Sequence, residues 1–305
     1  MALSSSTSTG KTNETREAGW KSEEAARKYA RAEAVTRPFC RQLITQAGLR
    51  DYDSALNVLD LACGTGAATA ALYETLKEVN NPSTKVTVFC GDIGPAMVEW
   101  VRERGKREGW EGMEAHIMDG QSLRLPSNTF THVLCTFSIF MMPDDTLSKC
   151  LELLVPGGTL GITTWSRLSW YPLLARAISA SESKPYLPSE EEFEARLFGG
   201  VPWQDINWVQ TTMESEGFQQ IVVRNEKMKL NCGEPSEFVT MMFMMIRMLS
   251  TFWEENDRER LIKEVTKALQ EETEEEVQAT DGKLYLVFEA LVGTGRKASL
   301  EKSET

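Results

Sequence analysis

The sequence predicts an α/β fold in which helices pack on both faces of a doubly wound, mostly parallel sheet. Apolar runs of strand length alternate with amphipathic helical patterns between residues 57 and 165, which is the order typical of this class. A tight glycine turn directly follows the first apolar run, as in nucleotide-binding sheets. The 305 residues, 41% of them hydrophobic, are enough to bury one sizeable core. We therefore expect a single domain with embellishments.

The expected strands are short apolar segments bounded by polar or glycine-containing turns. Helical patterns separate the first five of them, and Pro156-Gly157-Gly158 predicts a turn before the fifth. The seven expected strands are residues 57–62, 85–92, 114–119, 131–137, 159–165, 220–230 and 283–291.

The remaining segments predict a helical cap around this sheet. Insertions over the carboxyl edge of a sheet commonly build the substrate side of a pocket, so we expect the helical blocks between the later strands to do so. The expected organisation is a disordered tail (1–20), N-terminal lid helices (21–50), a main domain (51–292) with helical insertions at about 168–217 and 234–280, and a polar tail (293–305).

Composition excludes several classes of partner. The net charge of −12 repels phosphate backbones, and no basic stripe offsets it, so we expect no nucleic-acid binding. The six cysteines are scattered without a C-x-x-C pair, which indicates reduced, mostly buried thiols and no metal site. No apolar stretch reaches the ~18 residues that a membrane span needs, and the N-terminus lacks a signal-peptide core. We expect a soluble, cytoplasmic protein.

The stretch "VLDLACGTGAATAAL", residues 58–72, combines a strand that ends near Asp60 with glycines at 64 and 66 and a helix that begins near Ala67. Such a turn presents free backbone N–H groups to a ligand. A dinucleotide fingerprint requires Gly or Ala at the position of Thr69, so an NAD-dependent oxidoreductase is disfavoured.

Acidic residues follow three successive expected strands. Asp60 ends the first, Asp92 the second, and Asp119, followed by Gly120, the third. Carboxylates at this edge suit the ribose hydroxyls and adenine amine of an adenosine together with a positive charge, whereas they repel a pyrophosphate. This combination fits S-adenosylmethionine, which carries an ammonium and a sulfonium.

Four ordered motifs resemble those of class I S-adenosylmethionine-dependent methyltransferases. They are "VLDLACGTGAAT", "GDIGPAM", "MDGQSLRLPSNTFTHVLCTFSI" and "LVPGGTLGITTW". The resemblance implies a Rossmann-like seven-stranded sheet of order 3-2-1-4-5-7-6 with the last strand antiparallel. The family usually has glycine at the position of Ala62, a small-residue departure here.

The resemblance assigns roles to the acids, each with a structural alternative. Asp92 is expected to bind the ribose, or to cap the helix after it. Asp119 is expected to bind the adenine, or to cap a turn. Asp60 is expected to hold the glycine loop and the ammonium, or only the loop. Tyr29 closes over the cofactor, or lies on an ordinary amphipathic face. The further expected cofactor contacts are Ala62, Gly64, Gly66, Ile93, Met97, Gly120 and Phe137.

A closer resemblance covers about residues 22–292. The stretches "EGW", "TTWSRLSWYPLLARAI", "EFVTMMFMMI" and "FWEENDRER" are similar to fungal methyltransferases of secondary metabolism, including bis-thiomethyltransferases of the gliotoxin type, which S-methylate the dithiol form of an epipolythiodioxopiperazine. The residues expected to line the pocket of a small-molecule substrate, or else to pack in a core, are Ser138, Trp165, Trp170, Met241, Met244 and Met245.

Methyl transfer needs alignment of two reactants more than acid–base groups. The only histidines, His116 and His132, lie inside expected core strands and are interpreted as structural. A thiol, partly ionised near neutral pH, suits a site without a base. The leading hypothesis is S-methylation of a thiol or dithiol. The alternatives are N- or O-methylation of another metabolite, or a non-methylating cyclase or regulatory protein that binds S-adenosylmethionine. Whether the chain is a monomer or a homodimer is left open.

Overall fold

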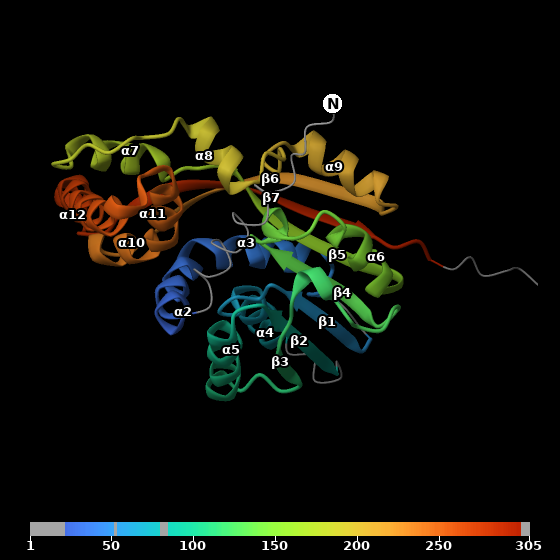
Figure 1. Ribbon diagram of the computed structural model, residues 1–305. Coiled ribbons are helices and arrows are strands. Elements are labelled where there is room, and N and C mark those ends of the chain that lie inside the picture. Colours follow the sequence, from blue (N-terminus) through green and yellow to red (C-terminus); the bar gives the residue numbers. More distant parts are fainter. Residues whose placement is uncertain (1–21, 52–53, 80–84, 300–305) are drawn as a thin grey trace, which may run out of the picture.

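A seven-stranded sheet forms the centre of the molecule, as the computed structural model shows for residues 22–51, 54–79 and 85–299 (Figure 1). The expected N-terminal tail, 1–20, lies outside the described residues. The strand order is β3-β2-β1-β4-β5-β7-β6, with β7 antiparallel to both neighbours, which confirms the predicted fold and order. The strands are β1 (Leu56–Leu61), β2 (Val86–Asp92), β3 (Met113–Ile117), β4 (Phe130–Thr136), β5 (Leu154–Arg167), β6 (Gln219–Asn231) and β7 (Tyr285–Arg296).

Most strand boundaries lie within two residues of the predicted ones, but the start of β5 and the end of β7 differ by five residues. β5 begins at Leu154, so the Pro156–Gly158 segment lies inside the strand, where a register shift against β4 and the left-handed Gly157 (φ +79°) absorb it. β7 continues to Arg296, so placing the start of the polar tail at 293 was wrong. The small residues Gly293 and Gly295 let this strand end pack closely between β5 and β6.

Helices cover both faces of the sheet. On one face α3 (Glu33–Gln46) packs beside α4 (Ala67–Val79), and α5 (Pro95–Glu108) covers β2 and β3. On the other lie α6 (Thr146–Leu153) and α9 (Ile206–Ser215). Met213 of α9 contacts Gly295, whereas Leu43 of α3 contacts Gly161, which faces the opposite way. α9 is therefore part of the sheet packing, and the cap that was expected from 168–217 contains only the two helices before it.

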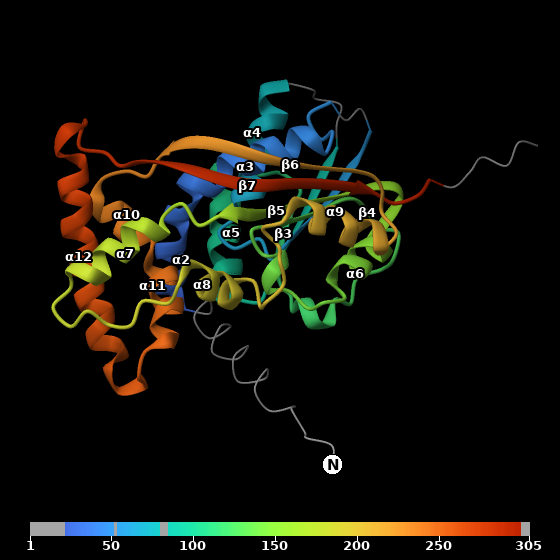
Figure 2. The same ribbon diagram turned by 90° about the horizontal axis from the view of Figure 1, so that it is seen from above.

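A helical lobe projects from the sheet on the extended ends of β6 and β7 (Figures 1 and 2). It comprises α7 (Tyr171–Ala180), α8 (Glu190–Leu197), α10 (Pro235–Met241), α11 (Phe243–Leu249) and α12 (Arg258–Glu276). Aromatic packing fills its interior: the rings of Trp170 and Phe193 meet edge to face at 5.4 Å. Short 3₁₀ turns connect the elements: η1 (Ala30–Ala32), η2 (Gly120–Ser122), η3 (Ile139–Met141), η4 (Ser250–Phe252), η5 (Glu255–Asp257) and η6 (Val277–Ala279).

The segment that was expected to form a lid divides into two parts. α2 (Glu23–Tyr29) and η1 lie between the helical lobe and α5 (Figure 1), a position that fits a lid. α3 is instead a core helix, because Phe39, Leu43 and Ile44 are fully buried. Lifting α3 would expose all of this apolar surface, so only α2 and η1 fit the description of a lid.

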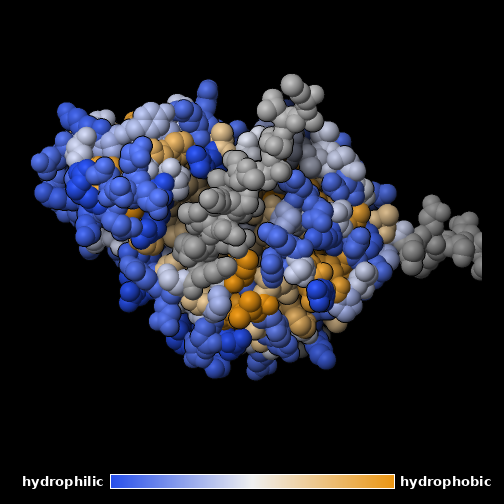
Figure 3. Space-filling view, in the orientation of Figure 1, coloured by the Kyte–Doolittle hydropathy of each residue, from blue (hydrophilic) through white to orange (hydrophobic). Residues whose placement is uncertain are grey.

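The surface is mostly hydrophilic on the face shown in Figure 3, and the exposed hydrophobic residues gather mainly in the lower middle of the view. Within the described ranges, no helix is long and apolar enough to cross a membrane. All six cysteines are buried free thiols, as the sequence predicted.

Candidate active site

The glycine turn between β1 and α4 takes three left-handed residues, at Ala62 (φ +55°), Gly64 (φ +53°) and Gly66 (φ +88°). Gly66 is required sterically as well, because an ideal Cβ there would lie 2.6 Å from Val101 Cγ2. The ring of Trp110 lies 3.5 Å from the same point and closes the underside of the turn. Val101 and Trp110 thus pack against one side of the turn, and the turn itself lies at the carboxyl edge of the sheet.

Asp60 lies at the end of β1 with 1% of its surface exposed. Its Oδ2 accepts hydrogen bonds from the Thr69 hydroxyl at 2.6 Å and the Thr69 N–H at 3.2 Å. Its Oδ1 is buried and has no hydrogen-bond partner among the described residues. Burial raises the pKa of Asp60 to about 6, against the lowering effect of the Thr69 bonds. Thr69 therefore holds the Asp60 carboxylate in place. Its departure from the dinucleotide fingerprint did not indicate this role.

Asp92 ends β2 beside the turn and is 7% exposed. Its Oδ2 accepts from the Gly64 N–H and its Oδ1 from the Gly94 N–H, both at 2.8 Å. Burial raises its pKa, and these two bonds oppose that rise. Gly94 is the N-cap residue of α5 and has no side chain to cap the helix. The N-cap position belongs to Gly94, so Asp92 does not cap α5 but ties the glycine turn to the residue before the helix. Its contact with the ribose stays a prediction.

The other expected cofactor contacts flank this pair. Ile93 follows Asp92 and is half-buried, and Met97 is buried in the first turns of α5. Asp119 is exposed and caps η2, with Oδ1 accepting from the Gln121 N–H at 2.8 Å. An ideal Cβ on Gly120 would lie 2.4 Å from Met142 Cε. Asp119 therefore makes the turn-capping contact, and a role toward adenine stays a prediction.

Tyr29, the last residue of α2, lies directly over the glycine turn. Its Cε1 is 2.9 Å from an ideal Cβ on Gly64, so any larger residue at 64 would displace the ring. Burial raises the pKa of Tyr29, and the nearby Cys40 and Asp92 raise it further. Tyr29 therefore packs on the turn, and its closure over the cofactor stays a prediction.

An aromatic wall follows the carboxyl end of β4. Phe137 is left-handed (φ +52°), and its N–H donates to the Thr163 carbonyl and hydroxyl, both at 3.0 Å. Its ring lies 4.2 Å from that of Trp165, and Phe39 meets both rings edge-on at 6.0 Å. Ser138 is buried beside Phe137, with its Oγ 3.1 Å from the sulfur of Cys135.

The remaining candidate substrate residues lie in the helical lobe. Trp170 packs against Phe193 inside the lobe, which corresponds to the core-packing alternative. Met244 is buried in α11, whereas Met241 and Met245 are half-buried and pack on the same apolar cluster. The structure therefore brings Trp165 and Ser138 to the sheet edge but not Trp170.

The two histidines differ. His132 is buried in β4, with Nε2 3.2 Å from the Ala47 carbonyl oxygen, and burial lowers its pKa to about 4. His116 was expected in the core but is exposed, because β3 is an edge strand and the ring lies on Phe89 next to Glu114. Neither reaches the glycine turn as a base.

Sequence reasoning missed the supports of the turn. Trp110, in the "EGW" stretch, packs under Gly66 and stacks on Tyr73 with ring centroids 5.5 Å apart. Glu33 and Arg104 form a buried ion pair against the turn, with a shortest separation of 2.6 Å. An acid one helical turn after Tyr29 was the available signal for Glu33, because both side chains then share a face.

The residues at this edge fit S-adenosylmethionine. The unpartnered Oδ1 of Asp60 is a buried carboxylate oxygen, which suits a cationic group. Asp92 and Asp119 lie at neighbouring strand ends, where hydroxyl and amine donors of an adenosine are expected. Among the described residues, no group of three or more His, Cys, Asp or Glu side chains is placed to hold a metal ion.

Comparison with known proteins agrees with this geometry. Residues 58–158 match the family described as a methyltransferase domain. Methyltransferase tpcH of Aspergillus fumigatus is 31% identical over 277 residues, which cover 89% of this chain and 96% of that protein. Acetylaranotin bis-thiomethyltransferase of Aspergillus terreus is also 31% identical over 277 residues, covering 90% of this chain and 95% of the relative. The solved phosphoethanolamine N-methyltransferase 2 of Haemonchus contortus in complex with S-adenosyl-L-methionine shares the fold (TM-score 0.54, 14% identity, 94% of this chain and 60% of that chain).

The chain belongs to the class I S-adenosylmethionine-dependent methyltransferases. Within this class it is related over almost its full length to fungal methyltransferases of secondary metabolism. Its cofactor is S-adenosylmethionine, as the sequence predicted.

Proposed function

We propose that this methyltransferase S-methylates a thiol or dithiol of a small-molecule natural product. The observation that carries the proposal is the 31% identity, over 90% of this chain, to a protein whose name describes a bis-thiomethyltransferase. The lack of a histidine base at the turn supports it, because a thiol ionises near neutral pH without assistance, whereas an alcohol does not.

The cofactor is proposed to lie against the glycine turn at the carboxyl edge of the sheet, next to the ring of Tyr29. Asp60 Oδ1 then takes the ammonium group, Asp92 the ribose hydroxyls and Asp119 the adenine amine. When bound, S-adenosylmethionine supplies a methyl group attached to a sulfonium sulfur, an electrophile that needs alignment more than activation. The further contacts proposed are Ala62, Gly64, Gly66, Ile93, Met97, Gly120 and Phe137.

The acceptor is proposed to approach along the aromatic wall. Trp165 is half-buried and packs on the buried ring of Phe137 at the end of β4, and apolar surface of this kind excludes water from a methyl-transfer site. Met241 and Met245, half-buried in the lobe, are proposed to face the acceptor, since methionine adapts to irregular apolar shapes.

The chain's own thiols near the site are kept neutral. Burial raises the pKa of Cys135 to about 12, and it raises the pKa of Cys40 as well. A neutral thiol is a poor nucleophile, so the protein itself does not compete with the acceptor for the methyl group.

A direct test offers the purified chain and S-adenosylmethionine matched acceptors on one scaffold that carry a thiol, a dithiol, a phenol or an amine. The expected result is a mass increase of about 14 Da per methyl on the thiol compounds, at the sulfur atom. Transfer only to the phenol or the amine would replace the proposal by O- or N-methylation. Cofactor binding without transfer to any acceptor in the panel would count against it and favour the non-methylating alternative.

A further inference from the structure

The lid and the first residue of α3 contact the glycine turn through two side chains that lie one helical turn apart. Tyr29 covers Gly64, and Glu33 accepts a hydrogen bond from the hydroxyl of the next residue, Thr65, at 2.8 Å. α2, η1 and α3 follow one another without a break from Glu23 to Gln46, so these two contacts are rigidly related.

Arg104 of α5 completes the contact from the other side. Its Nη1 donates to both Glu33 oxygens, at 2.6 and 2.8 Å, and to the Thr65 carbonyl oxygen at 3.1 Å. Its Nε donates to Glu108 at 2.8 Å. The Thr65 residue is therefore held at its hydroxyl by Glu33 and at its carbonyl by Arg104.

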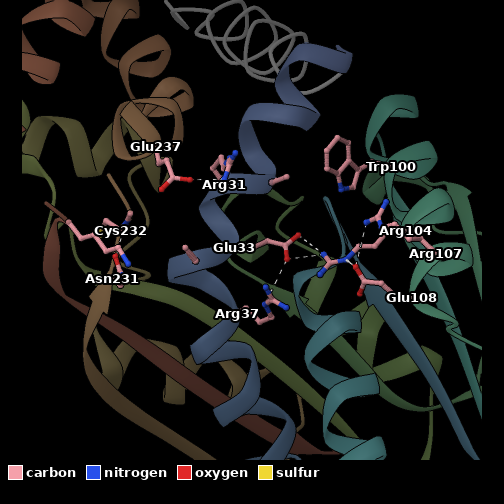
Figure 4. Close-up of a pocket in the computed structure, with 14 residues that line it drawn as sticks. Arg31, Glu33, Arg37, Trp100, Arg104, Arg107, Glu108, Asn231, Cys232 and Glu237 are labelled. Atoms are coloured by element: carbon pink, nitrogen blue, oxygen red, sulfur yellow. Dashed lines mark hydrogen bonds and ion pairs between the residues drawn. The ribbon is translucent and has the colours of Figure 1, made fainter. Parts of the chain in front are cut away.

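The Glu33–Arg104 ion pair is much more deeply buried than the ion pair that joins the lid to the helical lobe. Glu33 is 5% exposed, Arg104 6% and Thr65 1%. The pair lines a pocket of about 480 Å³ between the lid, α5 and the start of α10 (Figure 4). Arg31, in the same pocket, pairs with Glu237 of the lobe at 2.8 Å, and both of these side chains are exposed.

A buried ion pair is poorly explained as a device for stability, because its desolvation offsets much of its attraction. Its value is geometric: it fixes groups that hydrophobic packing would leave free to shift. Here the fixed group is the middle peptide of the cofactor-binding turn, between the two glycines that give the turn its shape.

We propose that Glu33 and Arg104 are positioning residues, which hold the Thr65 peptide and the Tyr29 lid together and so set how tightly the enzyme retains S-adenosylmethionine. The lid and the turn are coupled through Glu33. When α2 and η1 open, Glu33 is displaced, and its hydrogen bond to the Thr65 hydroxyl is lost. This inference rests on the cofactor of the class and not on the identity of the methyl acceptor.

The sharpest variant is Thr65→Val, which removes the hydroxyl, keeps the branched shape and leaves the ion pair intact. The expected result, by calorimetric titration with S-adenosylmethionine, is a dissociation constant raised roughly tenfold, the usual effect of losing a hydrogen bond to a charged group. Thr65→Ser retains the hydroxyl and is expected to restore binding to within about twofold of wild type. Glu33→Gln is expected to weaken binding at least as much as Thr65→Val.

Arg41→Gln is the matched control. Arg41 also joins α3 to α4, through Glu74 at 3.0 Å and through Glu78, but its side chain is 41% exposed and these contacts lie away from the turn. It is expected to leave cofactor affinity within about twofold of wild type, because exposed pairs contribute little.

Kinetics separate positioning from general stability. With an accepted substrate, Thr65→Val is expected to raise KM for S-adenosylmethionine and leave kcat nearly unchanged at saturation. Unaltered cofactor affinity in both Thr65→Val and Glu33→Gln, with only a lower resistance to urea, would overturn the proposal. Failure of the wild-type chain to methylate thiols would leave this result unaffected, since cofactor binding is measured alone.

Discussion

The glycine turn and the helical lobe are held in place by different physical means. At the turn, buried polar groups fix the backbone: Asp60 holds Thr69, Asp92 holds Gly64 and Gly94. In the lobe, apolar rings such as Phe193 and Trp170 fill the space between helices, and the charged residues lie at the surface.

Because of this difference, the two regions tolerate different kinds of substitution. Hydrogen-bonded carboxylates tolerate almost no change in position, because each replaced partner leaves a buried donor unsatisfied. Packed apolar cores accept many combinations of similar volume. The turn is therefore suited to one fixed cofactor, whereas the lobe can accept more changes of sequence. Changes in the two regions should consequently have separable effects on stability and on cofactor affinity.

The largest effect on stability is expected in the lobe, from Phe193→Ala. Phe193 is fully buried and touches the rings of Trp170 and Phe252, so truncation should lower the free energy of unfolding by about 3–5 kcal/mol. Urea denaturation measures this loss. Affinity for S-adenosylmethionine, measured well below the urea transition, should stay within about twofold, since no lobe ring supports the turn.

Phe193→Leu is the control for Phe193→Ala. It keeps most of the apolar volume and should lose clearly less stability, within about 1.5 kcal/mol. If Phe193→Ala instead weakened cofactor binding strongly without lowering stability, the separation of the two regions would be wrong.

At the turn, Asp92→Ala should give the largest loss of cofactor affinity. The change leaves the Gly64 and Gly94 N–H groups without their acceptors and removes the proposed ribose contact. We expect the dissociation constant for S-adenosylmethionine to rise by about 100-fold, from two lost bonds to a charged group. Calorimetry against Asp92→Asn, which keeps one acceptor oxygen, tests the role of the charge. Undiminished binding in Asp92→Ala would remove Asp92 from the cofactor site.

The sheet and the acids of the turn could be predicted because local sequence determines them. A parallel strand needs a continuous apolar run, and the residue after it lies at the carboxyl edge whatever surrounds it. Asp60, Asp92 and Gly64 were placed by this rule alone. β5 and β7 were predicted too short because their ends are held by pairing with distant strands, including the glycine-rich end of β7, which has little intrinsic strand preference.

The supports of the site could not be predicted, because they join residues far apart in the sequence. Glu33 and Arg104 are 71 residues apart, so the spacing of Glu33 from Tyr29 indicates a shared helix face but cannot indicate its partner. The error at His116 has a different origin. The order 3-2-1-4-5-7-6 that the resemblance implied already places the third strand at an edge, so the exposure of His116 could have been predicted. Trp170 was indistinguishable from Trp165 by sequence, because aromatic residues serve both cores and pockets.

The pH dependence of cofactor binding tests Asp60 specifically. Its folded pKa is raised to about 6 from 3.8, so in the free protein folding favours the protonated acid, and its contribution to stability declines as pH rises from about 4 to 6. A bound ammonium favours the carboxylate, so binding should tighten as pH rises toward 7. We expect the dissociation constant to be about tenfold higher at pH 5 than at pH 7.

Titrations at pH 5, 6 and 7 in two buffers of different ionisation enthalpy measure this change and the proton released on binding. In Asp60→Asn the side chain does not titrate, so the pH dependence due to this residue should disappear, whatever its overall affinity. An equal dependence in the variant would assign the effect to another group, of which Asp92, also raised in pKa, is the nearest.

The smallest effect is expected from Ala62→Gly. Its comparison with Gly66→Ala contrasts two left-handed residues of the same turn. Ala62 is left-handed (φ +55°), a conformation that disfavours any side chain by about 1–2 kcal/mol, whereas glycine adds about 0.4–1 kcal/mol of entropy to the unfolded chain. We therefore expect a slight gain, about 0.5 kcal/mol in the free energy of unfolding. Gly66→Ala has the opposite expectation, because its Cβ would collide with Val101 Cγ2 at 2.6 Å. Urea denaturation of both variants measures these changes. A loss above about 1 kcal/mol in Ala62→Gly would mean that the Ala62 methyl group packs favourably. Alanine at this position would then be explained by a stabilising contact and not by a tolerated strain.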